Sequence, residues 1–304
     1  MDNGQDSTRY PRILSSAERQ QRVIPLSFQL AGVALNVLSL VHNEWAAGVL
    51  SRLFFTVFKS EPKPWVAEFW QSADECVEVS VDEVSIPVRL WGQGPLIVLM
   101  HGWSGTGTQY QHFIPPLVEA GFRVACFDAP EHGSNPGRKS HMLRFKSSLI
   151  AIQNEIGPID TVIAHSLGGM ATTFAVQQGL TPTRVVLIAP HLNVQKIFET
   201  YRDLLSMRPR LAQRFRERIG ERMAALTDGL DPWEDFIPSR LLDQSQLRGM
   251  LVYDSEDPEI SAIQFEEMAR LWRNSMVHNT RGLGHNRILK DAAVIDTIAN
   301  YLKS

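Results

Sequence analysis

A serine between a strand pattern and a helix pattern is the residue of this chain best placed to do chemistry. The segment DTVIAHSLGGMATTFAVQQGL has an apolar run that ends at Ala164, a tight turn that carries Ser166, and a helical pattern directly after it. Small residues two positions before and after the serine, Ala164 and Gly168, allow the strand and the helix to approach closely. Such a turn places the hydroxyl at the N-terminus of the helix, where free N–H groups favour developing negative charge. The pattern predicts that Ser166 is a nucleophile.

A serine hydroxyl needs an adjacent base to react near neutral pH. His285 lies in GLGHNRIL, which we predict to be a loop between the last strand and the last helix. Glycines beside a histidine allow close backbone approach and are typical of a functional loop rather than of core filling. His285 is therefore the predicted general base.

The base in turn needs a carboxylate that fixes its tautomer and stabilises the imidazolium. The segment DSEDPEI, after the apolar run GMLVY, offers four acidic residues. We expect Asp257 to be the orienting acid, because it lies several residues beyond the strand and is followed by Pro258, which stiffens the turn. Asp254 is the alternative.

Acyl transfer at a serine also needs donors for a tetrahedral oxyanion. The run LIVLM leads into HGWSGTG, whose glycines let the backbone turn close to a substrate. The expected donors are the backbone N–H groups of Trp103 and Leu167. The side chain of Trp103 is a candidate substrate-binding group. His165 should point away from the Ser166 hydroxyl and is the second candidate for contact with the substrate.

Eight strands are predicted, most of them continuous apolar runs. They cover residues 76–81, 85–91, 96–100, 123–127, 160–164, 184–189, 249–253 and 275–280. The first two, separated by Asp82 and Glu83, favour an antiparallel hairpin. Continuous apolar runs separated by helical patterns indicate strands covered on both faces. The expected fold is α/β, with a mostly parallel, doubly wound sheet.

Breaks in this rhythm suggest four segments. We predict an N-terminal helical extension and linker over 1–75, and a first part of the α/β core over 76–190. A helical cap then covers 191–245, and the second part of the core covers 246–304. In the cap, Leu211, Phe215, Ile219 and Met223 recur every four residues, which is typical of a helix with one buried face. We interpret the many arginines of the cap as solvated and balanced by nearby acidic residues, rather than as a site for an acidic substrate.

The N-terminal extension is unusually apolar, with no charged residue from Val23 to Asn43. Gln29, Asn36 and Asn43 recur every seven residues and form one polar stripe on a helix. Three roles remain open, namely packing on the main domain or a sister subunit, an in-plane membrane anchor, and a transmembrane span. A span needs about 20 apolar residues, and Pro25, Gln29 and Asn36 interrupt the available window. The following segment KSEPKPWVAEF is predicted to be a linker.

Composition limits the function classes. The chain has 304 residues, with 30 Lys and Arg against 33 Asp and Glu, so a net charge of −3 argues against nucleic-acid binding. Two cysteines, without metal-ligand spacing, predict neither a disulfide framework nor a metal site. The polar N-terminus predicts no cleaved signal. We expect a cytoplasmic location, with membrane association through the N-terminal helices and homo-oligomer formation left open.

Five segments together resemble the α/β-hydrolase superfamily, from about residue 76 to the C-terminus. They are HGWSG, FDAPEHGSN, AHSLGG, DSEDP and GLGH. The chain is most similar to the bacterial esterase and lipase-like branch with a helical cap. The resemblance implies structural roles for Asp128, His132 and Gly133 near the mouth of the site. Ala164 departs from the usual first glycine of G-x-S-x-G, and Asp254 stands where a glycine is common before the acid.

These features support a hydrolase that cleaves a small-molecule carboxylic ester or thioester through an acyl-Ser166 intermediate, without a cofactor. The same three side chains serve thioesterases, amidases, lactonases and C–C hydrolases, so the substrate stays open. A non-catalytic binding or membrane-tethering module on a hydrolase scaffold is the alternative from another class.

Overall fold

The structure is a computed structural model of the 304-residue chain. It describes residues 26–191, 193–227, 229–238 and 247–304. The predicted absence of a cleaved signal and the end of the predicted cap, residues 239–245, lie outside the described residues.

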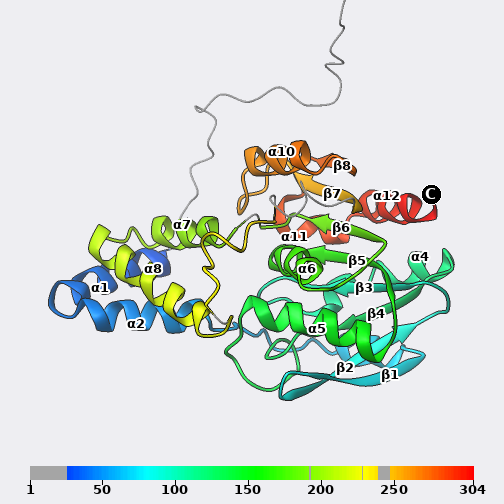
Figure 1. Ribbon diagram of the computed structural model, residues 1–304, viewed down its shortest axis with the longest axis horizontal. Coiled ribbons are helices and arrows are strands. Elements are labelled where there is room, and N and C mark those ends of the chain that lie inside the picture. Colours follow the sequence, from blue (N-terminus) through cyan, green and yellow to red (C-terminus); the bar gives the residue numbers. More distant parts are fainter. Residues whose placement is uncertain (1–25, 192, 228, 239–246) are drawn as a thin grey trace, which may run out of the picture.

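One sheet of eight strands organises the molecule (Figure 1). Its spatial order is β1-β2-β4-β3-β5-β6-β7-β8. The strands are β1 (Glu75–Val81), β2 (Val84–Trp91), β3 (Leu96–Met100), β4 (Arg123–Phe127), β5 (Ile159–His165), β6 (Arg184–Ile188), β7 (Arg248–Asp254) and β8 (Ser275–Thr280). Strand β2 pairs antiparallel with β1 and β4, and the remaining pairs are parallel. The mostly parallel α/β sheet predicted from the apolar runs is confirmed.

Helices cover both faces of this sheet. They are η2 (Gly107–Tyr110), α4 (Ile114–Glu119), α5 (Met142–Glu155), α6 (Leu167–Gln177), α10 (Ala262–Leu271), α11 (Gly284–Arg287), η3 (Ile288–Lys290) and α12 (Ala292–Lys303). Within β3, Val98 packs in the apolar cluster under α5 and α6, whereas Ile97 and Leu99 pack in the cluster under α4 and α12. Successive strand residues point to opposite faces, so a run of five buried residues feeds both cores.

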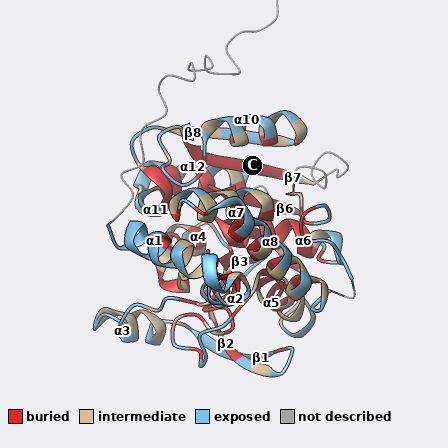
Figure 2. Ribbon diagram, turned by 90° about the vertical axis from the view of Figure 1, so that its left-hand side faces the viewer, coloured by how far each residue is buried: buried red, intermediate tan, exposed pale blue. Residues whose placement is uncertain are grey.

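A second group of helices lies to one side of the sheet (Figure 1). It contains α7 (Val194–Leu204) and α8 (Pro209–Ala224), inserted between β6 and β7, together with α1 (Leu26–Val41) and α2 (Asn43–Phe54). The predicted stripe on α8 is buried, because Leu211, Phe215 and Ile219 are 0% exposed and Met223 is 4% exposed. None of the described helices combines the length and the apolarity needed to cross a membrane. Figure 2 shows pale, exposed ribbon on α1 and α2 and red, buried ribbon behind them.

The prediction of a linker over residues 59–69 is wrong in its second half, because helix α3 (Trp65–Gln71) forms there. Pro64 precedes the helix, and a proline is compatible with a helix start because the first N–H groups need no partner. Phe69 stacks on Trp91 with ring centroids 5.5 Å apart, and Trp70 also lies against that ring. Aromatic packing against β2 therefore holds a segment whose prolines and charges are typical of a loop.

Candidate active site

Ser166 lies at the turn between β5 and α6, with φ 54° and ψ −122°. This left-handed backbone is costly for a residue with a side chain and is typical of a functional turn. Gly168 is required two residues later, because a Cβ there would collide with the backbone oxygen of His101. Ala164 is fully buried and fits on the other side of the turn. The departure from glycine at this position is thus accommodated.

His285 is brought to this turn by α11. Its Nε2 lies 2.9 Å from Ser166 Oγ, and its Nδ1 lies 2.8 Å from Asp257 Oδ2. The prediction of a loop at His285 is wrong, since the histidine sits within a short helical turn. A carboxylate only accepts, so Nδ1 carries the proton that it donates to Asp257. The Nε2 lone pair is then available to accept the Ser166 O–H.

Asp257 is the acid that contacts the histidine. Its side chain is 0% exposed, and its Oδ1 accepts the backbone N–H groups of Glu259 and Ile260 at 2.7 and 3.1 Å. These bonds fix the carboxylate orientation and leave Oδ2 to His285. The carboxylate of Glu259 lies 3.7 Å from His285 Nε2 and is half exposed.

Asp254, the alternative acid, holds the loop that leads to the histidine. Its carboxylate accepts the Thr280 hydroxyl at 2.8 Å and the backbone N–H groups of Leu283 and Gly282 at 2.9 and 3.2 Å. Burial acts to raise the pKa of Asp254, but these hydrogen bonds outweigh it and lower the pKa. The residue therefore stays ionised as a structural anchor.

Trp103 and Leu167, the expected oxyanion donors, both line the pocket beside Ser166. Among the described residues, neither backbone N–H has a protein acceptor. Gly102 allows the close approach of the two loops, since a Cβ there would lie 2.9 Å from Ser166 Cβ. The arrangement leaves two free donors at the turn that holds the serine.

His101 fixes the peptide group that carries the Trp103 N–H. Its Nε2 accepts the backbone N–H of Ala129 at 2.9 Å, so its proton lies on Nδ1, 2.7 Å from the Gly102 carbonyl. Burial lowers the pKa of His101 to about 4, which keeps the ring neutral near pH 7. The carbonyl of Gly102 and the N–H of Trp103 belong to one planar peptide, so holding the first orients the second.

His165 is buried and lies against His285. Its Nε2 donates to the backbone carbonyl of His285 at 2.9 Å, and the two ring centroids are 4.7 Å apart. Its Nδ1 is buried without a hydrogen-bond partner among the described residues, and the residue lines the pocket. Burial, with the nearby His285, lowers the pKa of His165 well below its usual value. A neutral, buried ring thus lies beside the site and contacts the backbone of His285.

The loop after β4 packs against the loop that carries Trp103. Asp128 accepts the backbone N–H groups of Gly107 and Ser134 at 2.8 and 3.2 Å. His132 packs edge-on against Trp103, with ring centroids 5.3 Å apart. Gly133 has φ 49°, and a Cβ there would collide with the Asp128 carboxylate. All three residues of the loop are in positions that fit the structural roles implied by the family resemblance.

A pocket of about 700 Å³ opens over the serine. Its floor is the turn with Ser166, and its walls include Val194, Ile197, Tyr201, Ile219 and Met223 from the inserted helices. Helices α1 and α2 also contribute Phe28 and Phe54, which the sequence does not predict to be site residues. No local pattern marks them. Phe54, for example, packs against Tyr201 of α7 and Phe215 of α8, which are distant in the chain. Within the described part of the chain, no group of three or more metal-ligating side chains is found.

Comparisons with known proteins define the class. Residues 97–297 match the model of the alpha/beta hydrolase family. The chain therefore belongs to the α/β-hydrolase family.

Curated relatives match over shorter stretches. A pimeloyl-[acyl-carrier protein] methyl ester esterase of Photobacterium profundum is 27% identical over 130 residues, which are 43% of this chain and 49% of the relative. A non-heme chloroperoxidase of Kitasatospora aureofaciens is 34% identical over 91 residues, or 29% of this chain and 33% of the relative. The chain thus spans less than half the length of either relative.

A solved structure shares the fold over a longer range. An esterase of Pyrococcus furiosus superposes with a TM-score of 0.58 at 14% identity, covering 82% of this chain and 96% of the other. Such low identity supports the common fold alone.

Proposed function

We propose that this hydrolase cleaves a carboxylic ester or thioester through an acyl-enzyme on Ser166. The main support for this proposal is the continuous chain of hydrogen bonds from Ser166 through His285 to Asp257, at 2.9 and 2.8 Å. These distances are those required between a nucleophile, its general base and the group that orients the base.

The proposed reaction has two halves. His285 Nε2 accepts the Ser166 proton as Oγ attacks the carbonyl carbon, and the carbonyl oxygen becomes an oxyanion that accepts the N–H groups of Trp103 and Leu167. The C–O or C–S bond to the leaving group then breaks, and the leaving group takes the proton from His285. In the second half, His285 deprotonates a water that attacks the acyl carbon, and Ser166 Oγ leaves with that proton.

The pocket favours an apolar acyl or alcohol part. Its walls from α7, α8, α1 and α2 are mainly aliphatic and aromatic, and α7 and α8 serve as a cap in this proposal. The curated relative acting on a methyl ester also supports ester cleavage. Thioesterase, amidase, lactonase and C–C hydrolase activities use the same side chains and remain alternatives.

The test is turnover of p-nitrophenyl esters of increasing acyl length by purified protein. Ser166→Ala is expected to remove at least about 99.9% of the activity. A site without its nucleophile keeps only the contribution of the oxyanion donors and of substrate binding, which is about 10³–10⁴-fold over the uncatalysed reaction in water. Ser148→Ala is the matched control, since its hydroxyl lies on α5 and donates to the Arg144 carbonyl at 2.7 Å. Equal rates for Ser166→Ala and the wild type, with both folded, would refute the assignment.

A further inference from the structure

Helix α1 has one apolar face that is exposed to solvent. Leu26, Leu30, Val33, Val37 and Leu40 are spaced by four, three, four and three residues, so they share one face, and all are 59% to 68% exposed. A helix in water normally buries such a face. The exposed stripe is continuous in sequence with α2, where Trp45 is 74% exposed and Val49 and Leu53 are exposed on one side.

Two asparagines, Asn36 of α1 and Asn43 of α2, face the protein. Asn36 Nδ2 donates to the Ser206 carbonyl at 3.1 Å, and its Oδ1 accepts the Arg208 N–H at 2.8 Å. Gly32 is the buried residue of the helix, and a Cβ there would collide with the backbone of Leu205. Asn43 donates to the Arg210 carbonyl at 3.3 Å. Polar contacts thus anchor the helix to the α7–α8 connection, and Leu35 and Leu38 pack against the core. The apolar residues on the outer side of α1 have no such partner among the described residues.

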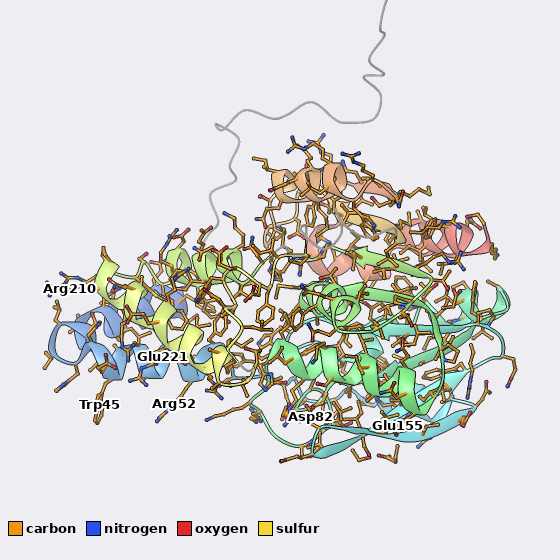
Figure 3. All side chains as sticks on the ribbon, in the orientation of Figure 1. Trp45, Arg52, Asp82, Glu155, Arg210 and Glu221 are labelled. Atoms are coloured by element: carbon orange, nitrogen blue, oxygen red, sulfur yellow. The ribbon has the colours of Figure 1, made fainter. Side chains whose placement is uncertain are left out.

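Charge around this surface is positive. Between residues 26 and 58 the charged side chains are Glu44 and Arg52. Glu44 is bound by Arg214 and Arg218, which lower its pKa to about 2. The carboxylate therefore stays ionised, and the two arginines balance its negative charge. Among the described residues no carboxylate lies within 4.0 Å of Arg52 or Arg210. Figure 3 shows Trp45 and Arg52 projecting from the same side of α2, and Arg210 at the end of this helical group farthest from the sheet.

We propose that this surface, the α1–α2 outer face, binds in the plane of a lipid bilayer that carries anionic headgroups. The face is defined by Leu26, Leu30, Val33, Val37, Leu40, Val41, Trp45, Val49 and Leu53. Apolar residues enter the boundary between headgroups and acyl chains, a tryptophan suits that boundary, and arginines at the edge pair with anionic headgroups. The absence of a membrane-spanning helix among the described residues fits binding in the plane rather than across it.

The position of the pocket gives this binding a consequence. Phe28 of α1 and Phe54 of α2 line the pocket above Ser166, while other residues of the same two helices form the outer face. An apolar ester dissolved in the bilayer would then reach the serine along α1 and α2 without crossing water. Delivery of substrate rests on the proposed esterase function, whereas membrane binding does not.

The experiment is flotation of the full chain with vesicles of phosphatidylcholine alone or with about 30% phosphatidylglycerol, at low and high salt. The wild type is expected to float with the anionic vesicles and to dissociate as salt rises. Val33→Glu should lower the partition coefficient about tenfold or more, because it removes an apolar group that the bilayer would bury and adds a charge that anionic headgroups repel. Arg52→Gln should lower binding to anionic vesicles about fivefold and leave neutral vesicles unchanged.

Ile263→Glu is the matched control. Ile263 lies on α10, away from the face, and its exposure of 63% equals that of Val33. This variant should float like the wild type. Flotation of Val33→Glu at the wild-type level, or no flotation of the wild type, would overturn the proposal. A dimer in sedimentation velocity that Val33→Glu dissociates, without flotation, would assign the face to a second copy of the chain.

Hydrolysis of a soluble p-nitrophenyl ester separates the two proposals. Val33→Glu should retain wild-type turnover, because Val33 does not line the pocket. Ser166→Ala should float like the wild type while losing turnover. A protein that floats but never hydrolyses esters would refute the esterase proposal alone.

Discussion

Asp254 ends β7, Asp257 lies three residues further on, and the two carboxylates have different partners. Asp257 orients His285 and accepts two backbone N–H groups of its own turn. Asp254 accepts one hydroxyl and two N–H groups from the segment that leads to α11. One carboxylate therefore faces the proposed chemistry, and the other holds the loop that delivers the histidine.

Substitution by asparagine should separate these roles. Asp257→Asn should lower kcat/KM about 10³–10⁴-fold with a small change in melting temperature, because the imidazole loses its orienting charge. Asp254→Asn should lower the free energy of unfolding by about 1–3 kcal/mol, since a buried ionised acceptor loses charge-assisted bonds. Ester turnover and thermal unfolding of both variants provide the measurements. Equal activity losses at both positions would contradict the division of roles.

At two places, glycine allows a helix to pack directly against the backbone of another segment. Gly168 lets α6 start directly against the loop after β3, and Gly32 lets α1 touch the backbone of the α7–α8 connection. Gly48 in α2 differs, because a Cβ there would meet nothing within 4 Å. Two glycines inside neighbouring helices of one helical group are therefore expected to respond in opposite ways to the same substitution.

Gly48→Ala should stabilise the protein by about 0.5–1 kcal/mol, which is the usual gain in helix propensity. Gly32→Ala should destabilise it by about 1–3 kcal/mol, because the added methyl forces α1 away from Leu205. Chemical denaturation measures both free energies of unfolding. A stabilising Gly32→Ala would mean that α1 does not pack as described.

At the scale of the whole molecule, the sequence predicts the sheet well because its strands are buried on both faces and so appear as continuous apolar runs. The turn at Ser166 and the positions of Asp257 and His285 follow from short local patterns. The α1–α2 contribution to the pocket could not be predicted, because Asn36 and Asn43 find their partners about 170 residues away. Helix α3 was missed for a similar reason, since Trp91 stabilises it from another element.

The arrangement of these elements also explains why the N-terminal helices matter. They lie outside the residues that match the family model, yet Phe28 and Phe54 line the pocket and the other side of the same helices carries the outer face. The residues that match the family model contain Ser166, Asp257 and His285 and the strands from β4 to β8. Helices α1 and α2 thus contribute both to the pocket and to the exposed outer face.

The most direct test of the central claim is labelling by a fluorophosphonate, followed by intact mass measurement and peptide mapping. An activated serine displaces fluoride and gains the phosphonyl group, so the wild type should gain one adduct located on Ser166. His285→Ala should label at least about 100-fold more slowly, because general-base assistance of this kind contributes 10²–10⁴-fold. Labelling at another residue, or equal rates for the wild type and His285→Ala, would contradict the account.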